Sequence, residues 1–207
     1  MFDVFSYFFA SYISAGFLVF FQPAIQVWLG GTEYLLPYSF VIAFSLTIYL
    51  LSVWEIVYKY RSVFGDYKQD RNCMLLSAIL NIIVSVALAK PLGVTGVQIG
   101  TFVAFLPIAY GRIRFVVGGF FEQSVKKYLL KHAGLFAVVL AEGATVYLLT
   151  RHMPITVGGI LLRFLVWGAV PLAINLLIYF RNPHFKDMCG HFKNLLNILL
   201  DKIKPKK

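Results

Sequence analysis

Charged residues are scarce in this sequence. Asp, Glu, Lys and Arg make up 14% of its 207 residues, whereas 59% are hydrophobic. A soluble domain typically has about 25% charged and 45–50% apolar residues. This scarcity excludes an ordinary water-soluble fold and predicts a chain that lies mainly in lipid.

The chain also lacks the residue clusters that enzymes and metalloproteins use. Its two cysteines, Cys73 and Cys189, have neither metal-ligand spacing nor an evident disulfide partner, and its four histidines are scattered. No HExxH, GxSxG or Gly-rich phosphate loop occurs. We therefore expect no catalytic residues, no metal and no cofactor, and we do not expect an enzyme.

The formal net charge of +10 has a membrane explanation. Nucleic-acid binding needs Lys and Arg on one water-exposed face together with base-stacking aromatics. Here the basic residues lie in the gaps between apolar runs, as is typical of membrane proteins. We expect membrane lipids, and no nucleic acid, as partners.

Six apolar runs are long enough to cross a bilayer as helices. They are residues 4–21, 37–58, 73–89, 97–117, 133–150 and 157–180. Gln22-Pro23 is expected to end the first run, and Pro107 is expected to kink the fourth. The first run lacks the basic leader and cleavage site of a signal peptide, so it should remain in the mature chain. The sequence predicts an all-α integral membrane protein with its transmembrane domain at residues 1–180.

The connections between the runs are expected to differ in kind. Residues 59–72 form a polar loop, and residues 90–96, with one Pro and two Gly, form a tight turn. Residues 118–132 place apolar residues on one helical face and lysines on the other, which predicts a segment at the headgroups. Residues 181–207 predict a basic amphipathic helix on the cytoplasmic surface, with a frayed terminus as the alternative.

Basic residues predict the orientation of the chain. The connection after the second run carries four Lys or Arg, the segment after the fourth carries five and the tail carries seven. The opposite side carries Lys90 and Arg151, with Arg163 inside the sixth run. By the positive-inside rule, both termini should be cytoplasmic in the cell (inner) membrane.

A small set of polar residues interrupts the apolar runs. It consists of Asn81, Glu142, Arg163 and Asn175. An ionised side chain at the bilayer centre costs at least about 2.5–3.5 kcal/mol, so such residues tend to face a cavity or a partner. We take these four as candidates for a substrate-binding or ion-coupling site. For the two asparagines, a hydrogen bond between helices is the alternative.

Glu142 and Arg163 come out at nearly the same depth when residues are counted inward from the basic-poor side. Three arrangements are open. The two side chains can pair and line an outward-opening aqueous cavity, or they can pair only to hold two helices together. In the third, Arg163 reaches the outer headgroups alone while Glu142 stays protonated.

Part of the sequence resembles a known family of transporters. Residues 61–101 contain a basic loop with Gly65 and Lys68, a span with Asn81 and Ser85, and a Leu-Gly-x-x-Gly turn at residues 92–96. Residues 26–37, QVWLGGTEYLLP, contain a Trp-Leu-Gly segment before a span. These features resemble the polysaccharide flippases, or lipid-linked oligosaccharide translocases, of the MATE-like MOP superfamily, whereas residues 118–207 match only in hydropathy.

The resemblance implies a flippase that moves undecaprenyl-linked oligosaccharide across the cytoplasmic membrane for polysaccharide biosynthesis. Family members have two helical lobes around a polar cavity, and this chain corresponds to the C-terminal portion only. Alternating access needs two bundles around a shared site. The chain is therefore expected to be a component or truncated form that works with a separate N-terminal lobe or a second copy, or else a nonfunctional remnant. The alternative class is a non-transporting protein that anchors a glycan-assembly complex.

Overall fold

The computed structural model describes residues 2–65, 67–180, 182–183, 185–187, 190–191 and 193–194. All regular elements of the described residues are helices. They are α1 (Phe2–Leu29), α2 (Tyr38–Phe64), α3 (Tyr67–Leu92), α4 (Val94–Ile113), the π-helix η1 (Arg114–Phe120), α5 (Val125–Thr150) and α6 (Val157–Tyr179).

Six segments of these helices are long and apolar enough to cross a membrane. They correspond one to one with the six apolar runs of the sequence. Many of their large apolar side chains are exposed, as lipid-facing side chains are; Leu177, for example, is 83% exposed. The prediction of an all-α, multi-pass membrane protein is confirmed.

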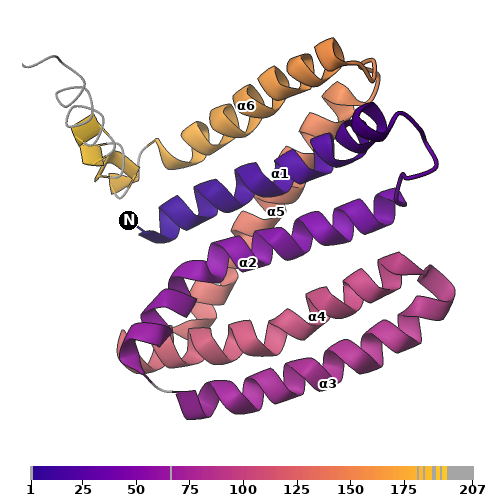
Figure 1. The fold of residues 1–207 in the computed structure, drawn as a ribbon. Helices are drawn as coiled ribbons and strands as arrows, with labels where there is room; N and C mark the ends of the chain where they lie inside the picture. The colour runs from indigo at the N-terminus through magenta and orange to yellow at the C-terminus, as the bar shows by residue number, and fades with distance from the viewer. Residues whose placement is uncertain are drawn as a thin grey trace, which may run out of the picture.

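The helices pass back and forth, so that consecutive helices are antiparallel (Figure 1). In this view α6, α1, α2, α4 and α3 follow one another as a row, and α5 crosses behind it (Figure 1). Helix α5 packs against α1 and α6, whereas α3 packs mainly on α4 at the edge of the row. The start of α1 and the end of α6 lie at the same end of the bundle (Figure 1).

Helix α1 continues through Pro23 to Leu29, so the expected end at Gln22-Pro23 is wrong. A proline removes one helical hydrogen bond, but a transmembrane helix tolerates this loss where neighbouring groups compensate. The apolar residues that follow Pro23 still need an internally hydrogen-bonded backbone. Gln22 donates from its side chain to the carbonyl of Leu36 and so ties α1 to the connection before α2.

The polar loop expected at residues 59–72 is largely helical, which corrects the prediction. Helix α2 runs to Phe64, its C-cap Gly65 adopts a left-handed φ of 73°, and α3 begins at Tyr67. Two charged residues of this segment, Arg61 and Asp70, belong to a buried ion network, described below, that joins the end of α2 to the start of α3. The turn expected at residues 90–96 is also shorter, because only Gly93, with φ 56°, separates α3 from α4.

Residues 118–132 do not form one continuous helical segment. The position of their lysines at the headgroups stays a prediction. The first three residues of the segment, 118–120, form the end of η1. Helix α5 then begins at Val125 and runs without a break to Thr150. Ser124 caps this helix through its hydroxyl, which accepts from the backbone N–H of Lys127. A capped start allows one long helix, so the lysines of the segment belong to the first turns of the fifth span.

The predicted amphipathic tail at residues 181–207 lies for the most part outside the described residues. Within the described part, Phe185 is buried and stacks on Phe8 and Tyr179, with ring centroids 6.3 Å apart in both pairs. Phe185 therefore packs on the bundle near the start of α1.

Helices α3 and α4 approach each other closely through glycines. A methyl group at Gly96 would overlap the carbonyl group of Leu88, and one at Gly100 would overlap Ser85. Backbone atoms cannot move aside as a flexible side chain can. Small residues at such crossings are the usual basis of helix association in membranes.

Gly96→Ala should lower the free energy of unfolding in detergent by about 1–3 kcal/mol, because the methyl group forces α3 away from α4. Gly134→Ala in α5 is the matched control, since nothing lies within 4 Å of its added methyl group. The control should be neutral or stabilising by up to about 1 kcal/mol through helix propensity. Denaturant unfolding followed by circular dichroism measures both, and equal effects would contradict the close packing.

Candidate functional site

A group of polar side chains is buried where α1, α5 and α6 meet. Tyr7, Ser11, Glu142 and Asn175 come from these three helices, and none of the four has any solvent-exposed surface. The amide nitrogen of Asn175 donates to the hydroxyl of Ser11 at 3.1 Å. Ser11 also lies beside the Glu142 carboxyl group, and Tyr7 is close enough to interact with it electrostatically. We call these four residues the polar core.

Aromatic rings surround the Tyr7 side of the polar core. Tyr7 meets Tyr49 of α2 edge-on, with ring centroids 6.5 Å apart, and lies against Tyr179 of α6 at 5.5 Å. All three rings are almost fully buried. They keep this end of the polar core away from water and lipid, and the Tyr7 hydroxyl has no hydrogen bond within the described part of the chain.

Glu142 has an incomplete set of partners. Neither of its carboxyl oxygens has a hydrogen bond within the described part of the chain. The nearby Ser11 hydroxyl gives its proton to the carbonyl oxygen of Phe8, at 3.1 Å. The side-chain oxygen of Asn175 also lacks a partner among the described residues. Buried polar atoms without a hydrogen-bond partner are uncommon in proteins, and a functional role is one explanation for them.

Arg163 does not pair with Glu142, so the two arrangements that require an interhelical pair are wrong. Its guanidinium donates to the backbone carbonyls of Thr150, at 3.2 Å, and Met153, at 2.7 Å. Thr150 lies eight residues beyond Glu142 on α5, which corresponds to about 12 Å along the helix. The two side chains are thus separated in depth, because counting residues inward cannot show which carbonyls an arginine will meet. Arg163 serves as a cap on the C-terminal end of α5.

Arg163→Gln should remove this cap and lower the free energy of unfolding by about 1.5–3 kcal/mol, the usual contribution of hydrogen bonds to a charged donor. Arg151→Gln is the control, because the Arg151 side chain is exposed and donates to its neighbour His152 rather than to a backbone carbonyl of α5. Hydrogen exchange should show faster opening of the last turn of α5 in the Arg163 variant alone. Equal protection in the two variants would contradict the capping role.

Asn81 lies away from the polar core, in the hairpin of α3 and α4. Its amide is 3.5 Å from the hydroxyl of Thr101, and its carbonyl oxygen accepts from Ser85 at 3.4 Å. The contact with Thr101 links α3 to α4, whereas the hydrogen bond from Ser85 lies within α3. The four predicted site residues are therefore found at three places: Glu142 and Asn175 together, Arg163 at the end of α5, and Asn81 at the edge of the bundle.

Two adjoining cavities lie between the end of the bundle with few basic residues (the basic-poor end) and the region beside the polar core. The outer cavity, about 350 Å³, is lined by Gln22 and Gln26 of α1 and by Arg163, among other residues. The inner cavity, about 330 Å³, reaches Gly143, the residue next to Glu142. The two cavities share walls formed by Leu18, Tyr38 and Tyr147.

The chemistry of the cavities changes with depth. The outer cavity has amide, hydroxyl and guanidinium groups, whereas mainly apolar residues line the inner one, with Ser14 and Ser45 between α1 and α2 as polar exceptions. The Ser14 hydroxyl donates to the carbonyl oxygen of Ser45 at 2.9 Å. This arrangement suits a ligand with a polar portion near the end of the bundle and an apolar portion deeper in it.

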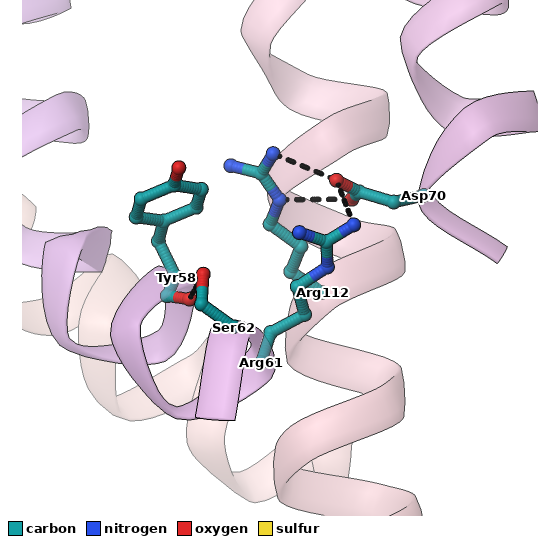
Figure 2. A network of polar contacts seen from close by, with 5 residues as sticks. All are labelled: Tyr58, Arg61, Ser62, Asp70 and Arg112. Carbon is teal, nitrogen blue, oxygen red and sulfur yellow. Dashed lines mark hydrogen bonds and ion pairs between the residues drawn. The ribbon is translucent and has the colours of Figure 1, made fainter. Parts of the chain in front are cut away.

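A second polar feature lies at the opposite end, between α2, α3 and α4. Figure 2 shows Asp70 held by two arginines from different helices. Arg61 approaches its carboxylate at 2.7 Å, and Arg112 makes a two-pronged contact at 2.9 and 3.0 Å. The side chain of Asp70 is only 4% exposed and that of Arg61 only 7%. The guanidinium groups also lie over aromatic rings, Arg61 over Tyr67 and Arg112 over Tyr58.

Sequence reasoning missed this network. It treated Arg61 and Arg112 as loop charges that set the orientation, and it gave Asp70 no role. The available signal was Asp70, an acidic residue in a basic segment just before the third apolar run, together with Arg112 near the end of the fourth run. Three helix ends with mixed charges at one membrane face can form an ion network.

No protein-family model, curated protein or solved structure matches this chain. The site must therefore be interpreted from its own geometry. A buried polar core beside two adjoining cavities is a candidate binding region, whereas the Arg61–Asp70–Arg112 network joins the ends of three helices.

Proposed function

We propose that this chain is a transport component for an amphiphilic, lipid-linked oligosaccharide. The observation that supports the proposal best is the pair of adjoining cavities, one lined by polar groups at the basic-poor end and the other reaching Gly143, the residue next to Glu142. A sugar unit suits the amide and guanidinium groups of the outer cavity, and its lipid carrier suits apolar surface. The resemblance of residues 26–37 and 61–101 to polysaccharide flippases favours the same substrate class.

We further propose the inner (cell) membrane as the location, with both termini cytoplasmic. The basic segments after α2 and α4 lie at the end of the bundle where α1 begins, and Lys90, Arg151 and Arg163 lie at the other end (Figure 1). Under the positive-inside rule the basic end faces the cytoplasm. The cavities would then open toward the outer side of the membrane.

A second helical bundle completes the proposal. Alternating access needs two bundles that rock around a shared site. The described residues form one bundle of six membrane-spanning helices. The second bundle is either a separate N-terminal lobe or another copy of this chain.

Transport is best tested in membrane vesicles from source cells, which retain any partner. Vesicles from cells that lack the chain should move lipid-linked oligosaccharide more slowly, and the unaltered chain should restore the rate. Glu142→Leu should not restore it, whereas Asn81→Ala, at the edge of the bundle, should. Unchanged transport without the chain, or equal failure of both variants, would refute the proposal.

A further inference from the structure

A pocket of about 640 Å³ lies between α2, η1 and the start of α5. It is separate from the polar core and from the two cavities described above. Its walls include the apolar side chains of Ile56, Val57, Val116 and Val117. It lies at the basic end of the bundle, where α2 ends and α5 begins (Figure 1).

The rim of this pocket is cationic and polar. Lys127 and Lys131 line it, together with Gln123 and Ser124. The two lysines are four residues apart on α5, so their side chains project from the same face of the helix. The first turn of α5 adds the partial positive charge of a helix N-terminus. The rim therefore favours an anion.

The backbone beside the pocket has an uncommon conformation. Val116 and Val117 belong to the seven-residue π-helix η1, a geometry that often occurs at functional sites. Between the pocket residues Phe121 and Gln123, Glu122 has φ 52°, the only positive φ outside glycine in the described chain. This irregular connection forms part of the pocket wall, since Val116, Val117, Phe121 and Gln123 all line the pocket.

We propose that this pocket binds an anionic phospholipid of the surrounding leaflet, with the phosphate at Lys127 and Lys131 and the upper acyl chain against the valine-lined wall. The cationic rim is complementary to the phosphate of such a lipid, and the apolar wall is complementary to its acyl chain. A free phosphate would satisfy the rim and leave the wall uncovered. The inference does not depend on transport, since it uses none of the residues of the polar core.

Native mass spectrometry of the purified chain in detergent tests the proposal directly. Phosphatidylglycerol should bind at least about tenfold more tightly than phosphatidylcholine. The double variant Lys127→Gln/Lys131→Gln should weaken phosphatidylglycerol binding about 25-fold, since each lysine near the headgroups contributes about fivefold. The charge-matched control Arg114→Gln/Lys126→Gln should stay within about twofold, because neither residue lines the pocket.

Two further measurements distinguish a lipid in the pocket from a free anion held at its rim. Ile56→Trp fills the apolar part of the pocket without changing its charge, and it should also weaken phosphatidylglycerol binding about tenfold. Inorganic phosphate at millimolar concentration should not displace the lipid. Equal binding of the two lipids, equal losses in both double variants, unchanged binding in Ile56→Trp or displacement by phosphate would each overturn the proposal. The lysine positions are exposed, so their variants should fold normally.

Discussion

Asp70→Asn is expected to lower the free energy of unfolding by about 3–5 kcal/mol, because it leaves two neighbouring guanidinium groups without their counter-charge. Arg61 is nearly fully buried, and the Arg112 side chain is 20% exposed. Neither can turn toward water without breaking its contact with an aromatic ring. Without these ion contacts, we expect the ends of α2, α3 and α4 to separate.

Denaturant unfolding in detergent, followed by circular dichroism, measures this effect. Glu55→Gln is the control, because it removes an exposed pair with Lys59 at 3.8 Å that contributes at most about 0.5 kcal/mol. A triple variant with apolar residues at Arg61, Asp70 and Arg112 should be far less destabilised than Asp70→Asn, since no charge is left unpaired. If Asp70→Asn behaves like Glu55→Gln, the network does not hold the helices together.

Glu142→Leu is expected to have the opposite effect on stability and to abolish transport. The carboxyl group is fully buried, and its oxygens lack hydrogen bonds within the described chain, so its removal should stabilise the fold by about 1–3 kcal/mol. A residue that reduces stability and is nevertheless retained is typical of a functional site. The same substitution removes the ionisable group beside the inner cavity, which accounts for the expected loss of transport.

Asn175→Leu provides the comparison for Glu142→Leu. This variant breaks the hydrogen bond of Asn175 to Ser11, so it should destabilise the fold by about 0.5–1.5 kcal/mol. The two buried polar neighbours should thus change stability in opposite directions. Destabilisation by Glu142→Leu, measured by the same unfolding experiment, would mean that the carboxyl group has a partner that stabilises it.

Hydropathy was sufficient to predict the six spans, because lipid requires long apolar helices. Where the helices end could not be predicted in the same way. The sequence placed an end at Pro23 and a loop at residues 59–72, yet α1 continues to Leu29 and α2 reaches Phe64. These ends depend on tertiary contacts, such as the buried pair of Arg61 and Asp70, that no local pattern shows.

The candidate site was predicted in part. Glu142 and Asn175 stood out because a polar residue within an apolar run needs a buried environment, and the structure brings both to Ser11. Arg163 stood out for the same reason, but its partners are backbone carbonyls, and a sequence does not show which carbonyls a helix end leaves free. Tyr7 and Ser11 were missed, since neither residue type is unusual in a transmembrane helix.

Labelling of single cysteines tests the account most directly, because it reports the orientation of the bundle and the opening of the cavities together. The variants Gln26→Cys, at the outer cavity, and Lys126→Cys, at the basic end, are compared in a chain in which Cys73 and Cys189 are replaced by serine. A membrane-impermeant maleimide applied to intact cells should label the Gln26 position and should label the Lys126 position only after permeabilisation. Labelling at the Lys126 position alone in intact cells would contradict both the orientation and the proposed outer opening.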